Sequence, residues 1–166
     1  MWSFSIFAQR AVVLISGLLL VGCGFQVRGA VEFPQQMSVV YVDTADRFTP
    51  FYKELTTVFG KSGLTVTRSP TDADTVFRIT RDETGQRVLS VSARNVPVEY
   101  DVFYKIQYSV YIDDAEVLPP QDLARNRDYT YEATEILGKA QEEAVLRDSL
   151  AAELVALVTR QMGSIN

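Results

Sequence analysis

Few side chains in this sequence could carry covalent chemistry. It has no histidine and one cysteine, Cys23. Serine-histidine-aspartate and cysteine-histidine nucleophile systems are therefore excluded, as are zinc sites built from the usual ligands. Three pairs of neighbouring acids remain as candidates for carboxylate chemistry: Asp72 with Asp74, Asp113 with Asp114, and Glu142 with Glu143. Such acids on a turn or an exposed helix are usually only solvated. With no phosphate-binding glycine loop present either, we expect no catalytic residue, no metal and no cofactor.

The single cysteine follows a segment typical of an export signal. Arg10 and the amino terminus supply positive charge, residues 11–21 are mostly apolar, and the small Gly22 precedes Cys23. This apolar stretch is shorter than the roughly 20 residues that a membrane-spanning helix needs. Leu20-Val21-Gly22-Cys23 is similar to the site where bacterial lipoprotein processing attaches a diacylglycerol to the thiol, cleaves before it and acylates the new amino terminus. We expect residues 1–22 to be removed and Cys23 to carry lipid. The alternative is a free cysteine after an ordinary cleaved signal.

Composition predicts one folded domain behind that anchor. The sequence has 166 residues, of which 47% are hydrophobic and 22% charged, as in ordinary globular domains. Its formal charge is −5, and removal of the signal takes away Arg10 and no acid, so the mature chain is one unit more negative. An acidic surface repels nucleic acid, which we therefore exclude as a partner.

Hydrophobic periodicity predicts the first half of that domain. Residues 37–42 form an apolar run typical of a buried strand, and residues 50–60 have helical spacing with Thr49 as the N-cap and Pro50 in the first turn. A short strand at 64–67 follows. Residues 75–80 and 87–93 are predicted to pair as a hairpin around Thr84-Gly85.

The second half contains the strongest strand pattern in the sequence. Residues 99–113 alternate between apolar and more polar side chains, which predicts a half-buried antiparallel strand. Its second face carries Phe103 and Tyr111, either for contact with a partner or for packing across strands. Leu118-Pro119-Pro120 predicts a loop that ends this region, residues 128–134 a further strand, and residues 139–162 a helix. That helix has one apolar stripe, formed by Leu146, Leu150, Leu154, Leu157, Val158 and Met162.

These elements predict an α+β fold. We expect two helices packed on one face of a mostly antiparallel sheet of four to five strands. Residues 1–22 are predicted to be the signal peptide, 23–36 an extended leader from the anchor, and 37–166 the single domain.

Several short motifs resemble the LptE family of lipopolysaccharide-assembly lipoproteins. Residues 23–29, Cys-Gly-Phe-Gln-Val-Arg-Gly, are similar to the start of its mature chains, although Gln26 replaces a frequent histidine. Phe33-Pro34, and Met37 before an apolar strand ending in Asp43, resemble its first strand. Arg94-Asn95 followed by Glu99-Tyr100 resembles its middle, and Lys139 with the acidic helix behind it resembles its end.

The resemblance implies a function without bond chemistry. LptE-like lipoproteins sit as a plug in the lumen of the large β-barrel LptD, and the pair delivers lipopolysaccharide to the outer leaflet of the outer membrane. It implies a domain that is anchored to the outer membrane and faces the periplasm and the barrel lumen. Glycine, and not aspartate, after Cys23 agrees with outer-membrane sorting. By position, Arg94 and Lys139 are the residues expected to meet lipopolysaccharide phosphates.

Two other functions remain open at this point. The chain could be an auxiliary lipoprotein subunit of another envelope lipid exporter, or an enzyme that uses paired carboxylates on envelope glycans. An exporter subunit would purify with inner-membrane components. A glycan hydrolase would lose activity when one acid of a pair is neutralised.

Overall fold

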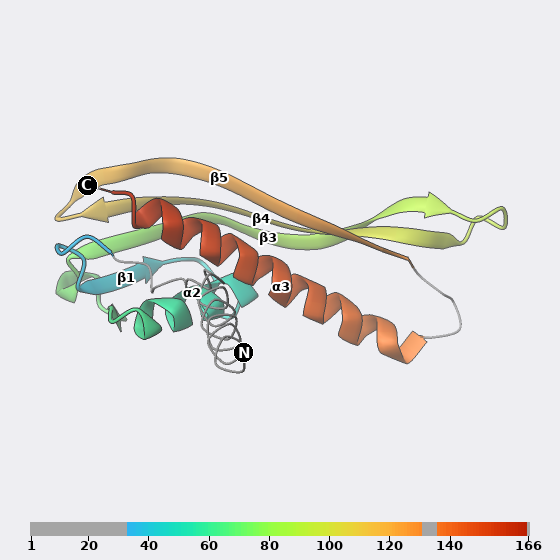
Figure 1. The fold of residues 1–166 in the computed structure, drawn as a ribbon, viewed down its shortest axis with the longest axis horizontal. Helices are drawn as coiled ribbons and strands as arrows, with labels where there is room; N and C mark the ends of the chain where they lie inside the picture. The colour runs from blue at the N-terminus through green and yellow to red at the C-terminus, as the bar shows by residue number, and fades with distance from the viewer. Residues whose placement is uncertain (1–32, 131–135, 166) are drawn as a thin grey trace, which may run out of the picture. The chain divides into compact units, whose positions relative to one another are not determined.

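The computed structural model describes residues 33–130 and 136–165, which lie in one compact unit, Val31–Asn166. A five-stranded sheet carries two α-helices on one face (Figure 1). In chain order the elements are β1 (Val39–Asp43), α2 (Pro50–Lys61), β2 (Thr65–Thr67), a short 3-10 turn (Pro70–Asp72), β3 (Thr75–Val91), β4 (Pro97–Ile112), β5 (Ala115–Thr130) and α3 (Ile136–Met162). The predicted α+β class, with two helices on one face, is confirmed.

The sheet is mixed, with the strand order β2-β1-β3-β4-β5. Strands β3, β4 and β5 are joined by short turns and pair antiparallel. Strand β1 pairs parallel with both β2 and β3. Helix α2 carries the chain back between β1 and β2, and the segment with the 3-10 turn carries it back between β2 and β3. The prediction of a mostly antiparallel sheet therefore holds for the three long strands, and the short strands add a parallel edge.

Local sequence explains why α2 begins and ends where it does. The Thr49 hydroxyl accepts a hydrogen bond from the Tyr52 amide at 3.1 Å, and Pro50 occupies the first turn, where its missing N–H costs nothing. Phe51, Leu55 and Phe59 are buried. Gly63, with φ 87°, follows the last turn in the left-handed region that glycine adopts without strain.

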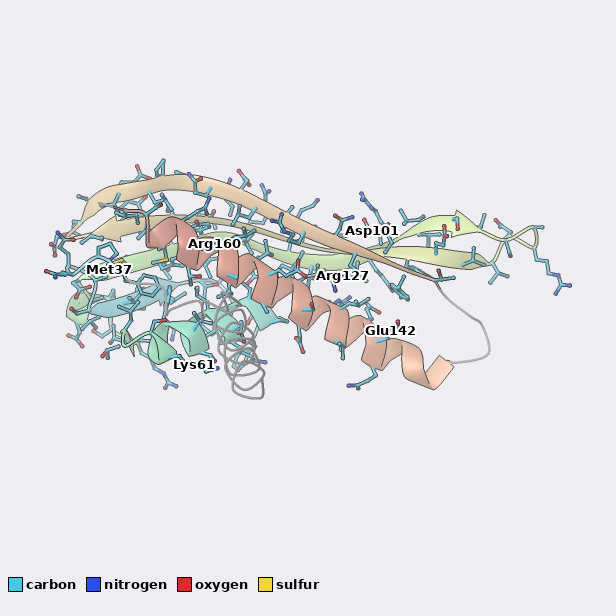
Figure 2. All side chains as sticks on the ribbon, viewed as in Figure 1. Met37, Lys61, Asp101, Arg127, Glu142 and Arg160 are labelled. Atoms are coloured by element: carbon cyan, nitrogen blue, oxygen red, sulfur yellow. The ribbon has the colours of Figure 1, made fainter. Side chains whose placement is uncertain are left out.

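Helix α3 packs on the sheet through its predicted apolar stripe. Leu150, Leu154, Val158 and Met162 are fully buried, and Leu146 and Leu157 pack partly buried against the same core. Polar contacts add to this packing, since the Tyr108 hydroxyl donates to Gln161, and Arg127, labelled in Figure 2, pairs with Glu153. Neither helix, within the part of the chain that the structure describes, is long and apolar enough to span a membrane.

The alternation of β4 separates the two faces of the sheet. Its even-numbered residues from Val102 to Ile112 are buried in the core beneath the helices, whereas Phe103, Lys105 and Gln107 point to the uncovered face. The period of two predicted for residues 99–113 is thus confirmed, with the strand beginning two residues earlier.

The predicted hairpin around Thr84-Gly85 is wrong. Residues 75–91 form one strand, and β4 pairs with it from Thr75↔Ile112 to Val91↔Pro97. Gly85 lies inside this strand opposite Phe103. A Cβ at Gly85 would lie 2.9 Å from the Phe103 ring, so the glycine marks a close approach and not a turn.

The loop predicted at Leu118-Pro119-Pro120 is also wrong. Strand β5 runs through these residues. The turn that joins β4 to β5 comes earlier, at Asp113 and Asp114, whose φ values of 48° and 63° suit a two-residue hairpin. The prolines fall where the β4–β5 register shifts between Tyr108 and Val110, on an edge strand that tolerates a missing N–H. Residues 128–130 of the predicted last strand end β5, and 131–134 lie outside the described residues.

Candidate functional site

Arg94 lies at the tip of the β3–β4 hairpin. The turn is closed by hydrogen bonds from the Ser92 amide to the Val96 carbonyl (2.8 Å) and from the Asn95 amide to the Ser92 carbonyl (2.9 Å). Asn95 takes a positive φ of 59°, which asparagine tolerates better than most residues. The Arg94 side chain is exposed, and it makes no ion pair with any described residue. The hairpin therefore presents one cation to the solvent.

Four aliphatic side chains of the same hairpin are also exposed. Val88, Leu89, Val91 and Val96 are each between 43% and 51% exposed. They are among the few large hydrophobic side chains that the described residues expose, and all four belong to the part of the β3–β4 hairpin nearest its turn. An exposed cation and exposed aliphatic side chains on one hairpin suit contact with an amphiphile that carries negative charge.

The other two predicted site residues are less fully described. Cys23 lies outside the described residues. Lys139 falls in the first turn of α3, at the start of the last helix as predicted, and its side chain is not among those that the structure describes. The β3–β4 turn and the start of α3 lie toward the same end of the domain (Figure 1). The structure thus brings the two basic positions to one end.

At least one member of each candidate acid pair has a structural role. The Asp74 carboxylate accepts hydrogen bonds from the amides of Ser38 (3.0 Å) and Val39 (2.9 Å). Asp113 and Asp114 form the β4–β5 turn, and Glu143 pairs with Arg147 one helical turn away. No group of three potential metal ligands occurs among the described residues.

Charges on the uncovered face of the sheet are paired across strands. Arg78 lies 2.9 Å from Asp43, Arg81 3.4 Å from Asp122, and Arg87 2.6 Å from Asp101. Aromatic rings take part as well, since Arg78 lies 5.0 Å from the Tyr111 ring centre and Lys105 5.0 Å from that of Phe103. Tyr111 thus packs across strands against Arg78, and Phe103 lies across from Gly85, in agreement with one of the two predicted alternatives.

Asp101 is the buried member of this face, with a side chain only 1% exposed. Burial alone would raise the pKa of its carboxyl. Hydrogen bonds from Asn126 (2.8 Å) and Arg87 (2.7 Å), with the charge of Arg87, outweigh burial and lower that pKa. The opposite carboxyl, Asp128, has a raised pKa because of desolvation and its proximity to Asp101. The sequence pattern did not indicate this cluster.

A second polar cluster joins α2 to the sheet. The buried Tyr104 hydroxyl donates to Asp82 (2.7 Å) and accepts from the Phe51 amide (3.2 Å), and the Thr49 hydroxyl also donates to Asp82 (2.6 Å). Burial, followed by the charge of Asp46, raises the pKa of Asp82 despite these hydrogen bonds. This network fixes the start of α2 and the loop before it.

That loop lies beside a hollow lined by two arginines, Arg47 and Arg68. These two arginines are distant in the chain and form no motif, so the sequence alone does not indicate them. Their only signal was the strand-helix-strand order that places both at the carboxyl ends of parallel strands.

The fold is that of several bacterial lipoprotein domains. A lipoprotein B from Nitrosomonas europaea superposes with a TM-score of 0.68 at 24% identity, covering 85% of this chain and 91% of that one. The rare lipoprotein B from Shewanella oneidensis superposes with a TM-score of 0.65 at 17% identity, covering 76% and 95%. These likenesses define a class of small α+β domains with two helices on one face of a mixed sheet.

Sequence comparison identifies the family within that class. The family model LptE, described as lipopolysaccharide-assembly, matches residues 37–162, which span the domain from before β1 to the end of α3. The LPS-assembly lipoprotein LptE of Yersinia enterocolitica is 24% identical over 154 residues, covering 89% of this chain and 74% of that protein. The chain belongs to the LptE family.

Proposed function

We propose that this chain is an outer-membrane lipoprotein, anchored through Cys23, that plugs the LptD β-barrel. In that position it assists assembly of the barrel and delivery of lipopolysaccharide to the outer leaflet. The observation that carries this proposal is the family match over residues 37–162. The name of the Yersinia enterocolitica relative, a lipopolysaccharide-assembly lipoprotein, supports the same role.

Within this role, Arg94 and Lys139 are proposed to bind phosphates of lipopolysaccharide. Arg94 supports the proposal because it is exposed, lacks an ion pair among the described residues and belongs to a hairpin that also exposes aliphatic side chains. A guanidinium group forms paired, charge-assisted hydrogen bonds to phosphate. The net charge of −5 means that attraction must be local, because the domain as a whole repels a polyanion.

The barrel partner can be identified by purification. The acylated chain, tagged at its carboxyl end, is extracted from native outer membranes in mild detergent and its companions are identified. We expect a very large β-barrel protein in stoichiometric amount. Recovery of inner-membrane components without a barrel would reject the plug role and favour a subunit of another lipid exporter.

Lipopolysaccharide binding is tested with a charge-reversal pair. Arg94→Glu with Lys139→Glu should weaken binding of the purified full chain by at least about tenfold, because each lost phosphate contact removes a charge-assisted hydrogen bond. Lys61→Glu with Arg160→Glu makes the same charge change on side chains away from the hairpin (Figure 2). Equal binding by both double variants, with unchanged circular dichroism, would reject Arg94 and Lys139 as the site.

A further inference from the structure

A hollow of about 620 Å³ opens where β1 and β2 end. It is lined by residues of the β1–α2 loop, by Tyr52 of α2 and by Arg68, the first residue after β2. It is separate from the β3–β4 hairpin that carries Arg94. The structure therefore offers a second basic position that the family resemblance did not indicate.

Parallel pairing explains why two arginines converge on this hollow. Tyr41 pairs with Thr67, so the segments that follow β1 and β2 leave the sheet at the same edge. Arg47 comes from the first of these segments and Arg68 from the second. In sheets with parallel strands, ligands bind beyond the carboxyl ends, where the chain order reverses. Here β1 lies between β2 and β3, so the order reverses at β1.

Neither guanidinium forms an ion pair with a carboxylate of the described residues. Among the described residues, the arginines in ion pairs with carboxylates are Arg78, Arg81, Arg87, Arg127 and Arg147. The single acid that lines the hollow is Asp46, and its carboxylate accepts a hydrogen bond from the Phe48 amide at 2.7 Å. The lining thus has a surplus positive charge in a domain that is acidic overall.

The hollow also has an apolar side. Phe48 is 81% exposed, the highest value among the large hydrophobic side chains that the structure describes as exposed. Arg47 is held in place by Tyr41, whose ring centre lies 5.9 Å from the guanidinium carbon and whose hydroxyl accepts a hydrogen bond from a guanidinium nitrogen at 3.5 Å. Hydrogen bonds between Thr44 and Asp46 hold the loop itself. Two arginines, of which Arg47 is held by Tyr41, and an exposed aromatic ring thus line the same hollow.

We propose that this hollow binds a phosphate group carried by a lipid. Arg47 and Arg68 contact the phosphate oxygens, because guanidinium groups match phosphate geometry, and Phe48 contacts the apolar part of the same molecule. The choice of a lipid as the carrier rests on the function proposed above. The hollow itself does not depend on Arg94 or Lys139.

The test measures binding residue by residue on the full chain in detergent. Amide resonances of the isotope-labelled protein are followed during three titrations: inorganic phosphate, phosphorylated lipid A, and the same lipid after removal of its phosphates. We expect the amides of Phe48 and Arg68 to shift with the first two probes and to shift far less with the third. Phosphorylated lipid should bind more tightly than inorganic phosphate, because Phe48 adds apolar contact.

Variants separate the two halves of the proposal. Arg47→Gln with Arg68→Gln should weaken the Phe48 and Arg68 responses at least about tenfold. Arg125→Gln with Arg160→Gln, which removes the same charge from other exposed positions, should leave them unchanged. Phe48→Ala should weaken lipid binding and leave the response to inorganic phosphate unchanged.

The outcomes also separate this proposal from the preceding one. Lipid-induced shifts confined to residues 92–96 would overturn the hollow and leave the role of Arg94 standing. Shifts at Phe48 and Arg68 with residues 92–96 silent would support the hollow and count against Arg94. An unchanged affinity after loss of both Arg47 and Arg68 would overturn the phosphate site, and equal affinity for inorganic phosphate and lipid would overturn the lipid assignment.

Discussion

At the scale of single residues, Asp101 shows how this domain accommodates a buried carboxylate. It belongs to the uncovered face of the sheet, yet it is fully buried. Arg87 and Asn126, from the flanking strands, donate hydrogen bonds to its two carboxylate oxygens. A buried carboxylate is tolerated when its oxygens are satisfied in this way. Ionised Asp101 therefore stabilises the pairing of β3, β4 and β5.

The lowered pKa of Asp101 predicts a specific pH dependence. A group whose folded-state pKa lies below its unfolded value stabilises the fold above the unfolded pKa, and that stabilisation is lost as the pH falls through the folded value. We expect Asp101→Asn to lower the free energy of unfolding by about 1–3 kcal/mol at neutral pH. The difference from the parent should shrink once the pH falls below about 4. Urea unfolding across this range measures it.

Two controls make this comparison specific. The parent and the Asp101→Asn variant are both compared in a background that carries Asp128→Asn. The pKa of Asp128 is raised, so this neighbouring carboxyl would otherwise take up a proton first. Asp122→Asn removes an acid from the same face whose side chain is 62% exposed, and should cost no more than about 1 kcal/mol. A cost for Asp101→Asn that stays constant from neutral to acidic pH would contradict the role given to its ionised form.

At the scale of elements, α2 is attached to the sheet by hydrogen bonds as well as by its apolar face. At the start of the helix, the Phe51 amide donates a hydrogen bond to the Tyr104 hydroxyl of β4. The hydroxyls of Thr49 and Tyr104 both donate to the Asp82 carboxylate of β3. The first turn of a helix has amide donors without partners inside the helix. In this domain the sheet supplies one of the missing acceptors, the Tyr104 hydroxyl for the Phe51 amide.

Tyr104→Phe should therefore destabilise the domain. The change keeps the ring and removes the hydroxyl, which leaves the Phe51 amide without its acceptor and Asp82 without one donor. We expect the free energy of unfolding to fall by about 1–3 kcal/mol. Tyr111→Phe is the matched control, because its hydroxyl lies on the uncovered face, 3.3 Å from Glu116. Equal urea midpoints for the two variants would show that the network contributes nothing to stability.

The elements that sequence predicted correctly are those with long, unbroken periodicity. The alternation of β4 and the stripe of α3 each report one continuous buried face, so they were found with nearly correct bounds. The continuity of β3 and β5 was missed at Thr84-Gly85 and at Pro119-Pro120. Glycine can also occur inside a strand where a neighbouring group approaches closely, and proline can occur on an edge strand, so neither residue alone proves a turn. Here the Phe103 ring accounts for Gly85 and an edge register shift accounts for the prolines.

The same limit applies to the candidate sites. Arg94 could be placed in a turn because its neighbours in sequence define that turn. The Arg87–Asp101–Asn126 cluster and the Arg47–Arg68 hollow depend on strand register and on parallel pairing. A single sequence contains no local pattern for either. Such contacts become visible only when the pairing partners are known.

At the scale of the whole molecule, both helices and the sheet share one core. Buried residues of β1, α2, β3, β4, β5 and α3 form a single cluster. A cavity anywhere in this cluster should lower the stability of all elements together, because their apolar faces cover one another. The described domain is therefore expected to unfold in one transition.

Leu154→Ala tests that expectation. Leu154 is fully buried between α3 and the sheet, so we expect a loss of about 2–5 kcal/mol in the free energy of unfolding. Leu157→Ala makes the same change at a partly buried position and should cost clearly less. Far-ultraviolet dichroism reports helices and sheet, and near-ultraviolet dichroism reports the buried tyrosines. Transitions that separate in these two signals would contradict a single cooperative core.

Attachment to the membrane is the last property that belongs to the whole molecule. With a formal charge of −5, the chain has no general attraction to anionic lipid surfaces, and the basic positions at Arg94 and in the hollow are local. Stable anchoring without a spanning helix needs two or more acyl chains. Because the sequence has only one cysteine, Cys23→Ser should abolish all thiol-linked lipid.

The Cys23→Ser experiment uses intact mass, because a variant bound to a barrel partner could stay with the membrane without any anchor. The parent purified from cells should begin at Cys23 and carry the added mass of a diacylglycerol and an amide-linked fatty acid. The variant should lack this added mass and keep its circular dichroism. A parent that retains residues 1–22 with an unmodified thiol would refute the anchor, and with it the outer-membrane position on which the plug proposal depends.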